Sequence, residues 1–312
     1  MARLWFLTCM IVAISLATLT EAQSTGVFFS EGWESGTAAT SFNSESYGVA
    51  TSSQFTVQGA IRAAGNYALQ RRLVGGTASG AIQYATQHFG DAPSGPTYAG
   101  TAGRRYDDLY VQFKIYYAPG FDTSNIDKQL IIGTQDDRRH SEICCNPWVA
   151  HYLTIFPVLG TRDLVAELNN KQSATSQWWG FRQNASGYGP GNRFVTQPGV
   201  WNTIEVRRRL NDMGVDNGIF QMWINGTLIA DHRTARYRTA WNGTVGSNPA
   251  YGTNFVMISD YALAPITRDE SLVYDDIKFS TTYIGVGTSE LPQTPRNLRI
   301  LPGDADEALA IR

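Results

Sequence analysis

Residues 108–117 alternate between two kinds of side chain, which is the clearest pattern in the chain. A period of two is typical of a β-strand whose two faces meet different surroundings. One set of positions is Leu109, Val111, Phe113 and Ile115, and the other is Tyr110, Gln112, Lys114 and Tyr116. The turn-forming stretch Ala118-Pro-Gly-Phe-Asp122 then ends the strand.

Further strands are predicted at turn-bounded intervals, and no segment has a sustained helical repeat. Besides 108–117, the predicted strands span residues 26–33, 129–133, 151–158, 164–169, 203–210, 219–224, 227–232, 254–260 and 272–280. Residues 34–60 are rich in Ser, Thr, Ala and Gly and are predicted to form loops over a sheet edge. Many strands without βαβ alternation predict an all-β protein, an antiparallel β-sandwich or barrel, with a jelly-roll sandwich as the leading form.

Two apolar runs meet at Asn225-Gly226, the strongest hairpin signal in the chain. A two-residue type I′ turn needs positive φ at both central positions, which Asn and Gly tolerate. The turn predicts the pairs Ile224–Thr227, Trp223–Leu228, Met222–Ile229 and Gln221–Ala230, with Ile219 opposite His232. The expected core residues are Phe220, Met222 and Ile229. Trp223, Gln221 and His232 are expected on the opposite face, which carries apolar area too and should be covered or grooved.

The strand before this hairpin carries three consecutive arginines, Arg207 to Arg209. Alternation places Trp201, Thr203, Glu205, Arg207 and Arg209 on one face, and Ile204, Val206, Arg208 and Leu210 on the other. Two interpretations of the arginines remain open: a solvated edge of the sheet, or the polar lining of a groove.

Composition agrees with a sheet-rich globular protein. The 312 residues include 8 Trp, 15 Tyr, 14 Phe and 30 Gly, and only 17% are charged. The net charge of −2 gives no large field that would attract a polyanion, so nucleic acid is not an expected partner.

The first residues have the layout of a secretory signal peptide. Arg3 supplies a positive charge, residues 4–19 are almost entirely apolar, and Thr20-Glu-Ala22 offers small residues before a cut. An uncleaved membrane anchor is the alternative, but the apolar segment is short and no later segment spans a bilayer. We therefore expect a secreted, extracellular protein without a membrane span in the mature chain. Its expected parts are a signal peptide at 1–22, a β-jelly-roll domain at 23–286 and a linker-like tail at 287–312.

Export would leave Cys144 and Cys145 as the cysteines of the mature chain, because Cys9 lies in the signal. Neighbouring cysteines can close a vicinal disulfide, pair between chains or stay reduced, and a staple within a loop is the favoured interpretation. Without a second pair, the sequence offers neither a zinc site nor a disulfide framework.

Three stretches resemble secreted polysaccharide lyases with a concanavalin A-like jelly roll. Residues 109–122 followed by Lys128-Gln-Leu are similar to the strand–GFD–Lys passage of these lyases. Residues 201–207 and 216–229 are similar to their late strand and hairpin, and residues 272–280 with Tyr283-Ile-Gly285 to their closing strand. The resemblance covers roughly residues 105–286. Its motifs are mainly structural and are shared by lectin-like and laminin G-like domains. It implies this fold and a polysaccharide partner.

A lyase of this kind would cleave a uronate-containing polysaccharide by β-elimination. The reaction needs a base beside the uronate carboxylate, an acid for the leaving oxygen, and Arg, Asn or Gln to neutralise the carboxylate. The candidate catalytic residues are His151, Tyr152, His140 and Arg139, and the candidate substrate-binding residues near them are Lys128, Gln129, Gln135 and Arg138. In the structural alternative, His151 and Tyr152 border the sandwich core and residues 138–140 form a solvated loop.

Aromatic side chains supply a second carbohydrate signal. Trp178, Trp179 and Tyr188 lie in a Gly-rich stretch read as a loop, where they could stack on sugar rings, and Trp223 is a further candidate for substrate binding. Packing of one tryptophan of the pair in the core is the competing interpretation.

The sequence lacks the residue patterns that other enzyme classes require. A retaining glucanase would show carboxylates two or four residues apart on one strand, whereas Glu167 stands alone and Asp275-Asp276 are adjacent, hence expected on opposite faces. No phosphate-binding loop, dinucleotide fingerprint or metalloprotease motif is present, so no metal and no cofactor are expected. This fold can hold a structural Ca²⁺, but no dense acidic loop identifies one. The alternative to a lyase is a non-catalytic lectin or laminin G-like carbohydrate-binding and adhesion module.

Overall fold

The computed structural model describes most of the chain between residues 26 and 286. The described ranges are 26–37, 43–47, 55–77, 82–91, 100–121, 126–127, 129–135, 149–157, 164–170, 175–179, 197–238, 251–262 and 265–286. The signal peptide at 1–22, the tail at 287–312 and the Cys144–Cys145 pair lie outside them, so those expectations stay predictions. The described residues contain no helix with the length and apolar character needed to cross a bilayer.

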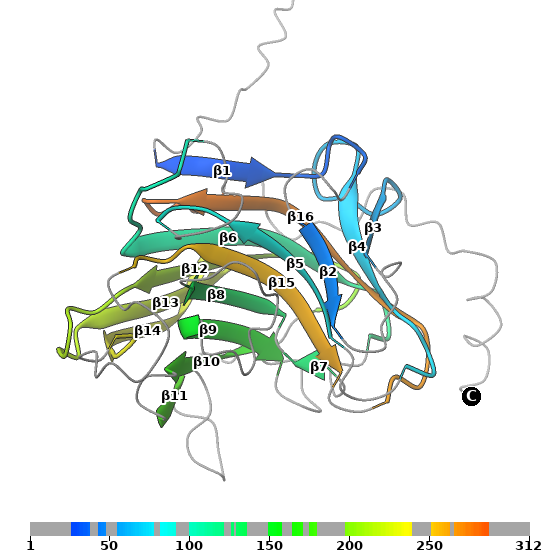
Figure 1. Cartoon of the computed structure of the whole chain (residues 1–312). Coiled ribbons are helices and arrows are strands. Elements are labelled where there is room, and N and C mark those ends of the chain that lie inside the picture. Colours follow the sequence, from blue (N-terminus) through cyan, green and yellow to red (C-terminus); the bar gives the residue numbers. More distant parts are fainter. Residues whose placement is uncertain are drawn as a thin grey trace, which may run out of the picture.

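One layer of the molecule is an antiparallel sheet, here called sheet A (Figure 1). Its strands follow the order β14 (Thr227–Ala235), β13 (Gly218–Ile224), β12 (Trp201–Arg209), β6 (Asp108–Tyr117), β16 (Glu270–Ser280), β4 (Ala68–Leu73) and β3 (Phe55–Gln58). The remaining strand, β1 (Val27–Glu31), also pairs with β16.

The other layer, sheet B, is antiparallel as well. Its order is β11 (Thr175–Trp179), β10 (Leu164–Asn170), β9 (Val149–Pro157), β8 (Leu130–Gln135), β15 (Phe255–Ala262), β5 (Ile82–His88) and β2 (Asn43–Tyr47), and β7 (Ile126–Asp127) pairs with β15. Two packed antiparallel sheets confirm the predicted all-β sandwich of the jelly-roll class.

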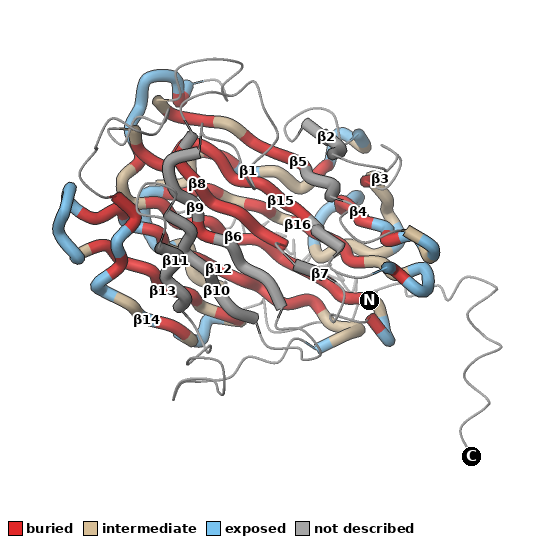
Figure 2. Tube along the Cα trace, turned by 60° about the horizontal axis from the view of Figure 1, so that its bottom comes forward, coloured by how far each residue is buried: buried red, intermediate tan, exposed pale blue. Residues whose placement is uncertain are grey.

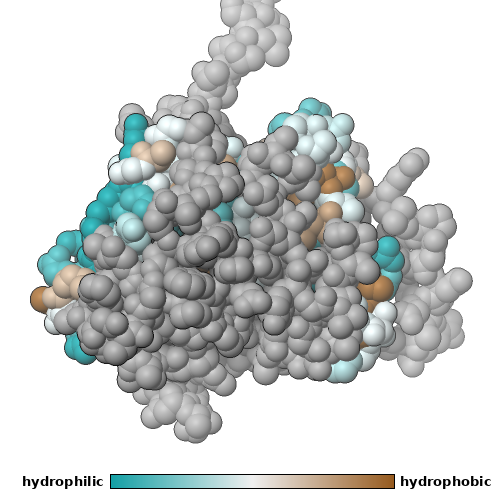
Figure 3. Space-filling model, viewed as in Figure 1, coloured by the Kyte–Doolittle hydropathy of each residue, from teal (hydrophilic) through white to brown (hydrophobic). Residues whose placement is uncertain are grey.

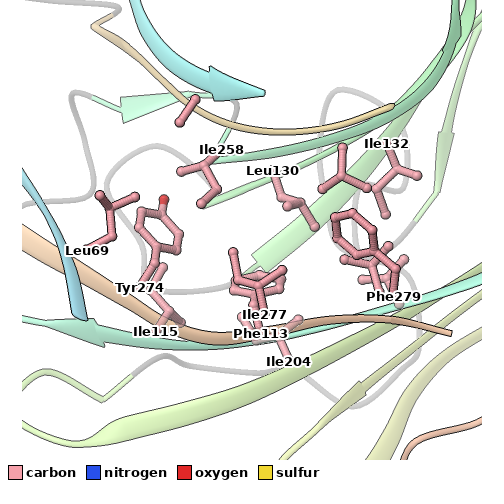
Figure 4. Close-up of a cluster of buried hydrophobic side chains, with 14 of the residues drawn as sticks. Leu69, Phe113, Ile115, Leu130, Ile132, Ile204, Ile258, Tyr274, Ile277 and Phe279 are labelled. Carbon is pink, nitrogen blue, oxygen red and sulfur yellow. The ribbon is translucent and has the colours of Figure 1, made fainter. Parts of the chain in front are cut away.

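The main core lies between the inner faces of the two sheets. Figure 4 shows side chains from both sheets meeting there. Sheet A contributes Leu69, Phe113, Ile115, Ile204, Tyr274, Ile277 and Phe279, and sheet B contributes Leu130, Ile132 and Ile258, each at most 1% exposed. Among the described residues, those in the middle of the strands are mostly buried, and the exposed ones lie mainly in the connections (Figure 2). The alternation of β6 is thus explained by the core, which holds its apolar set.

Every strand expected from the sequence is present, with ends that differ by a few residues. The sequence did not predict β2 to β5, β7 and β11. Polar residues interrupt the apolar pattern in several of these strands: Arg71 in β4, for example, is 2% exposed, with its guanidinium 5.4 Å from the Phe55 ring centroid. A buried arginine breaks the alternation of apolar residues from which a strand is predicted.

The predicted turn at Asn225-Gly226 is confirmed, with φ of 48° and 79°. The pairs Ile224–Thr227 and Trp223–Leu228 are also as predicted, but the register then shifts, so that Met222 pairs with Ala230, Gln221 with Asp231 and Phe220 with His232. The remaining predicted pairs are therefore wrong, because a bulge at this point adds one residue to β14. His232 stands beside Phe220, with ring planes 14° apart, and not on the face of Trp223.

The three arginines of β12 have three different environments. Arg208 is 0% exposed on the inner face, donates a hydrogen bond to Thr253, and lies with its guanidinium 4.9 Å from the Tyr237 ring centroid. Burial lowers the pKa of Arg208 to about 9. Arg207 lies on the outer face and is paired with Asp108, whereas Arg209 is exposed. A solvated edge is therefore wrong for Arg208, because β12 lies inside the sheet between β6 and β13.

Two chain segments cover part of the outer face of sheet A. Residues 59–67 contribute Ile61 and Ala63, which pack on Tyr116 and Trp201. Their backbone is fixed by Asp275, whose Oδ2 accepts hydrogen bonds from the N–H groups of Ala63 and Ala64 at 2.7 and 3.0 Å.

The second covering segment, residues 281–286, is called the strap. It follows β16 and is attached to Glu205 through the N–H groups of Ile284 and Gly285, at 2.8 and 2.9 Å from the carboxylate oxygens. Gln112 donates to both the Gly285 carbonyl and Glu205. Burial raises the pKa of Glu205, although these hydrogen bonds favour its charged form.

Asp275 and Asp276 share the outer face, against the expectation from strict alternation. Asp276 has a φ of 49° at a bulge, where Asp275 pairs with Lys114 and the next paired residue is Lys278. Asp276 lies 3.2 Å from Lys114 Nζ and 3.0 Å from Lys278 Nζ. Burial alone would raise the pKa of Asp276, but the two ammonium groups hold it below its usual value.

The burial of Asp275 predicts how the stability of the protein depends on pH. Burial raises its pKa from 3.8 to about 7. Between these values the folded protein holds a proton that the unfolded chain releases, so rising pH destabilises the folded state. We expect the free energy of unfolding of the natural protein to fall, relative to that of Asp275→Asn, between about pH 4 and about pH 7 in urea titrations.

Asp269→Asn is the control for this measurement, because a hydrogen bond from Arg72 lowers the pKa of Asp269, so its contribution to stability rises with pH at the low end of that window and does not fall through it. A constant difference between the natural protein and Asp275→Asn across the window would contradict the assignment.

Candidate functional site

The predicted site residues are distributed over several parts of the chain. Lys128, Arg138, Arg139, His140 and Tyr188 lie outside the described residues, so their roles stay predictions. Gln135 is the last residue of β8, His151 and Tyr152 lie in β9, and Trp178 and Trp179 end β11. The expectation of a loop for the two tryptophans is wrong, since they belong to an edge strand of sheet B.

Strand register aligns one row of positions across the outer face of sheet B. Asn169 of β10 pairs with Tyr152, Tyr152 with Gly133 of β8, Gly133 with Phe255 of β15, and Phe255 with His88 of β5. Cross-strand partners share a face of the sheet. This set is called the first row.

A second row runs beside the first, two residues along each strand. Its positions are Trp178, Glu167, Thr154, Ile131, Met257 and Thr86. The alternate positions between the rows, Leu153, Ile132 and Val256, are 0% exposed members of the core. Both rows therefore occupy the face of sheet B that points away from sheet A.

His151 and Tyr152 fall on opposite faces, as the alternation predicted. His151 is paired with Thr134, which is 0% exposed and donates a hydrogen bond to the Gly252 carbonyl at 2.9 Å. Trp179, paired with Ala166, is likewise on the inner side, opposite to Trp178. The register thus assigns Tyr152 and Trp178 to the outer face, and their sequence neighbours His151 and Trp179 to the inner face.

Gly133 gives the first row its local shape. The aromatic ring of Phe255 lies over this glycine: a Cβ added at Gly133 would come within 2.2 Å of the ring. The imidazole of His88 follows, with ring centroids 6.2 Å apart. A glycine that lets an aromatic ring cross its strand fixes the ring's position in the row.

Gln129 has a place in the core that explains it structurally. It is 2% exposed, and its Oε1 accepts a hydrogen bond from the Tyr117 hydroxyl at 2.7 Å. Its predicted contact with substrate stays a prediction that this geometry does not support.

Trp223 belongs to the other sheet. It lies partly buried on the outer face of sheet A, where its ring is 4.9 Å from that of Tyr283. The predicted site residues are therefore not one cluster: the catalytic candidate Tyr152 and the substrate-binding candidate Trp178 lie on sheet B, and the substrate-binding candidate Trp223 lies on sheet A.

The first row contains two polar residues that the sequence did not single out, His88 and Asn169. The signal for His88 was the stretch Ile82-Gln-Tyr-Ala-Thr-Gln-His88, in which Tyr84, Thr86 and His88 alternate with Gln83, Ala85 and Gln87. The polar side chains on both sides of this strand masked its period. Among the side chains that the structure describes, no group of three or more His, Cys, Asp or Glu could hold a metal ion.

Comparison with known proteins identifies the fold. No family model matches the chain, and no curated protein does either. The endo-β-1,4-glucuronan lyase of the fungus Trichoderma reesei is similar in structure, with a TM-score of 0.56 and 10% identity over 85% of this chain and 100% of that one. The PL-14 alginate lyase from Aplysia kurodai gives 0.52 and 11%, over 76% and 90%.

At these identities the likeness establishes the fold alone. The chain has the β-sandwich fold of jelly-roll polysaccharide lyases, in agreement with the resemblance seen in its sequence.

Gly133→Ala tests the geometry of the first row. The new methyl group would overlap the Phe255 ring, and we expect the free energy of unfolding to fall by about 1–3 kcal/mol in urea denaturation. Gly32→Ala is the matched control, because its Cβ would meet nothing closer than 3.7 Å. Equal stability of the two variants would contradict the close approach of Phe255 to β8.

Proposed function

We propose that the protein binds a uronate-containing polysaccharide across the outer face of sheet B and cleaves it by β-elimination. The observation that carries the proposal is the first row, which places Tyr152 next to Asn169 on one face, with His88 farther along the same line. A polysaccharide is a linear ligand, and it could contact the two ends of this row, at Tyr152 and at the half-buried His88, while the buried Gly133 and Phe255 lie beneath it.

Tyr152 is the proposed proton-transfer residue. β-Elimination removes the proton beside the uronate carboxylate and delivers a proton to the leaving glycosidic oxygen, and a tyrosine hydroxyl can serve either transfer. Asn169, its cross-strand partner, has an amide suited to hydrogen bonding the carboxylate as charge develops. His151 is not given a catalytic role in this proposal, because its register position is on the inner side of β9.

The candidate cationic residues 138–140 belong to the chain connection between β8 and β9, whose ends lie near Tyr152. The chain leaves β8 at Gln135 and enters β9 at Val149, close to the Gly133–Tyr152 pair. Arg138, Arg139 and His140 belong to this connection, and guanidinium groups match carboxylates in geometry and charge. We propose that they contribute to carboxylate binding.

His88 is assigned to a neighbouring sugar of the same chain. Three strand spacings separate β5 from β9, which is about 14 Å at 4.7–4.9 Å per spacing. At that separation Tyr152 and His88 cannot act on one atom, but both can contact one extended polymer.

Two comparisons support the choice of substrate class. The neighbours from Trichoderma reesei and Aplysia kurodai are lyases of glucuronan and of alginate, both uronate polymers. The predicted signal peptide at 1–22 fits an extracellular substrate of this kind, and we propose that the protein is secreted.

The decisive experiment incubates the protein with alginate, glucuronan and glycosaminoglycans and follows the ultraviolet absorbance of unsaturated uronate ends. We expect absorbance to rise with at least one polymer. Tyr152→Phe should lower the rate by about 100-fold or more with little change in thermal stability, because only the hydroxyl is lost.

His151→Ala is the contrasting variant. Its inner-side position predicts a loss of stability larger than that of Tyr152→Phe. Full activity of Tyr152→Phe would exclude the proposed role of this residue. Binding without an absorbance rise across the panel would exclude the lyase and leave a non-catalytic lectin or adhesion module.

A further inference from the structure

A cluster of aromatic rings lies on the outer face of sheet A. Trp223 of β13 has its ring centroid 4.9 Å from that of Tyr283 in the strap and 6.3 Å from that of Tyr110 in β6. Tyr110 and Tyr283 are also 6.3 Å apart. These three residues are called the aromatic platform. Trp223 and Tyr110 belong to sheet A, the sheet opposite to the first and second rows, and Tyr283 lies over its outer face.

A row of polar side chains runs beside the platform across four strands. The Arg207 guanidinium donates to both carboxylate oxygens of Asp108, at 2.9 and 2.7 Å, and to Gln221 Oε1 at 3.0 Å. Gln221 Nε2 in turn donates to Asp231 Oδ1 at 3.1 Å. The guanidinium also lies 5.3 Å from the Tyr110 ring centroid. This set is called the polar row.

The platform and the polar row reach solvent in part, since Tyr110 and Gln221 are only 9% and 5% exposed. Tyr283 is 44% exposed, and the carboxylate-bearing side chains of Asp108 and Asp231 are 37% and 32% exposed. The contacts that attach the strap to sheet A run through its backbone to Glu205 and Gln112. The Tyr283 ring adds its packing on Trp223 and Tyr110 to this attachment, and it still keeps 44% of its surface exposed to a ligand.

We propose that the aromatic platform and the polar row form a second polysaccharide-binding site, which takes a neutral pyranose glycan. The C–H face of a pyranose ring stacks on an aromatic ring, whose face carries negative charge density. Vicinal hydroxyl groups match planar carboxylate, amide and guanidinium groups, which can each make two hydrogen bonds. The hydrogen bonds within the polar row hold these groups in place before the ligand arrives, which lowers the entropic cost of binding.

Charge in the polar row favours a neutral sugar over a uronate. The positive charge of Arg207 is matched by Asp108, and that of Arg233 by Asp231, to which Arg233 donates two hydrogen bonds. A carboxylate placed at the platform would meet an Arg207 guanidinium that already donates to Asp108 and Gln221, with the carboxylates of Asp108 and Asp231 in the same row repelling an anion. Arg209, exposed on the same face, is the cross-strand partner of Asp108 and lies two residues farther from the Trp223 position along β12 than Arg207 does.

The site goes beyond the proposed lyase activity and does not depend on it. A second contact on the opposite sheet would keep the protein attached to a mixed polysaccharide while sheet B acts on another chain, because two linked sites raise the effective concentration of each.

The experiment measures the affinity of the full chain for hydroxyethyl cellulose, xyloglucan and dextran by affinity gel electrophoresis, with alginate as the acidic counterpart. We expect retention by at least one neutral glycan, and about tenfold weaker binding for Trp223→Ala and for Tyr283→Ala, as for an aromatic residue at the centre of a binding site. Tyr67→Ala is the matched control: Tyr67 is 39% exposed and lies in the covering segment 59–67. It should bind as the natural protein does.

Thermal unfolding of each variant shows whether it is folded. If Trp223→Ala does not fold, Tyr283→Ala alone tests the site. Cleavage of a soluble uronate polymer should be unchanged in Tyr283→Ala, so failure of this site and failure of the lyase are separate results. The proposal is overturned if no neutral glycan is retained, if folded Tyr283→Ala binds normally, or if alginate binds the platform as well as a neutral glycan does.

Discussion

The apolar layer between the two sheets determines the position of every other group described above. Side chains alternate along a strand, so once Leu130, Ile132 and Leu153 are committed to the core, their neighbours must lie on the outer face. This constraint is strict because a slip of one residue would bury a row of polar side chains without partners. Tyr152 and Trp178 therefore reach the outer face because of the residues beside them, independently of any function.

Much of the fold could be predicted because its strongest signals are local. Alternation in β6 and the Asn225-Gly226 turn depend on residues close together in the sequence, and both are confirmed. The failures are also local: one additional residue in β14 changes the partner of His232, and a bulge at Asp276 brings two adjacent carboxylates to one face. Bulges leave no clear mark on a pattern of apolar positions, so neither could be foreseen.

The candidate site was less predictable, since it depends on strand order. The opposite faces of His151 and Tyr152 followed from alternation alone. The line from Tyr152 to His88 requires β9, β8, β15 and β5 to be neighbours, although β15 lies about a hundred residues after β9 in the chain. No local pattern contains that information. The same reason explains why Trp223, a reasonable sugar-binding candidate by type, belongs to the opposite sheet, and why Gln129 was not recognised as a partner of Tyr117.

At the end of the sandwich where β13 and β14 lie, the described surface carries both hydrophilic and hydrophobic atoms (Figure 3), and opposite charges there are paired, as in Arg236–Asp216 and Arg105–Asp107. The strap crosses sheet A towards this hairpin, with Val286 next to the Gly226 turn. A pulling force transmitted through the residues after Val286 would therefore load the bonds from Ile284 and Gly285 to Glu205 before it reached β16. The two hydrogen bonds to Glu205 would have to break before the force could pull β16 out of sheet A.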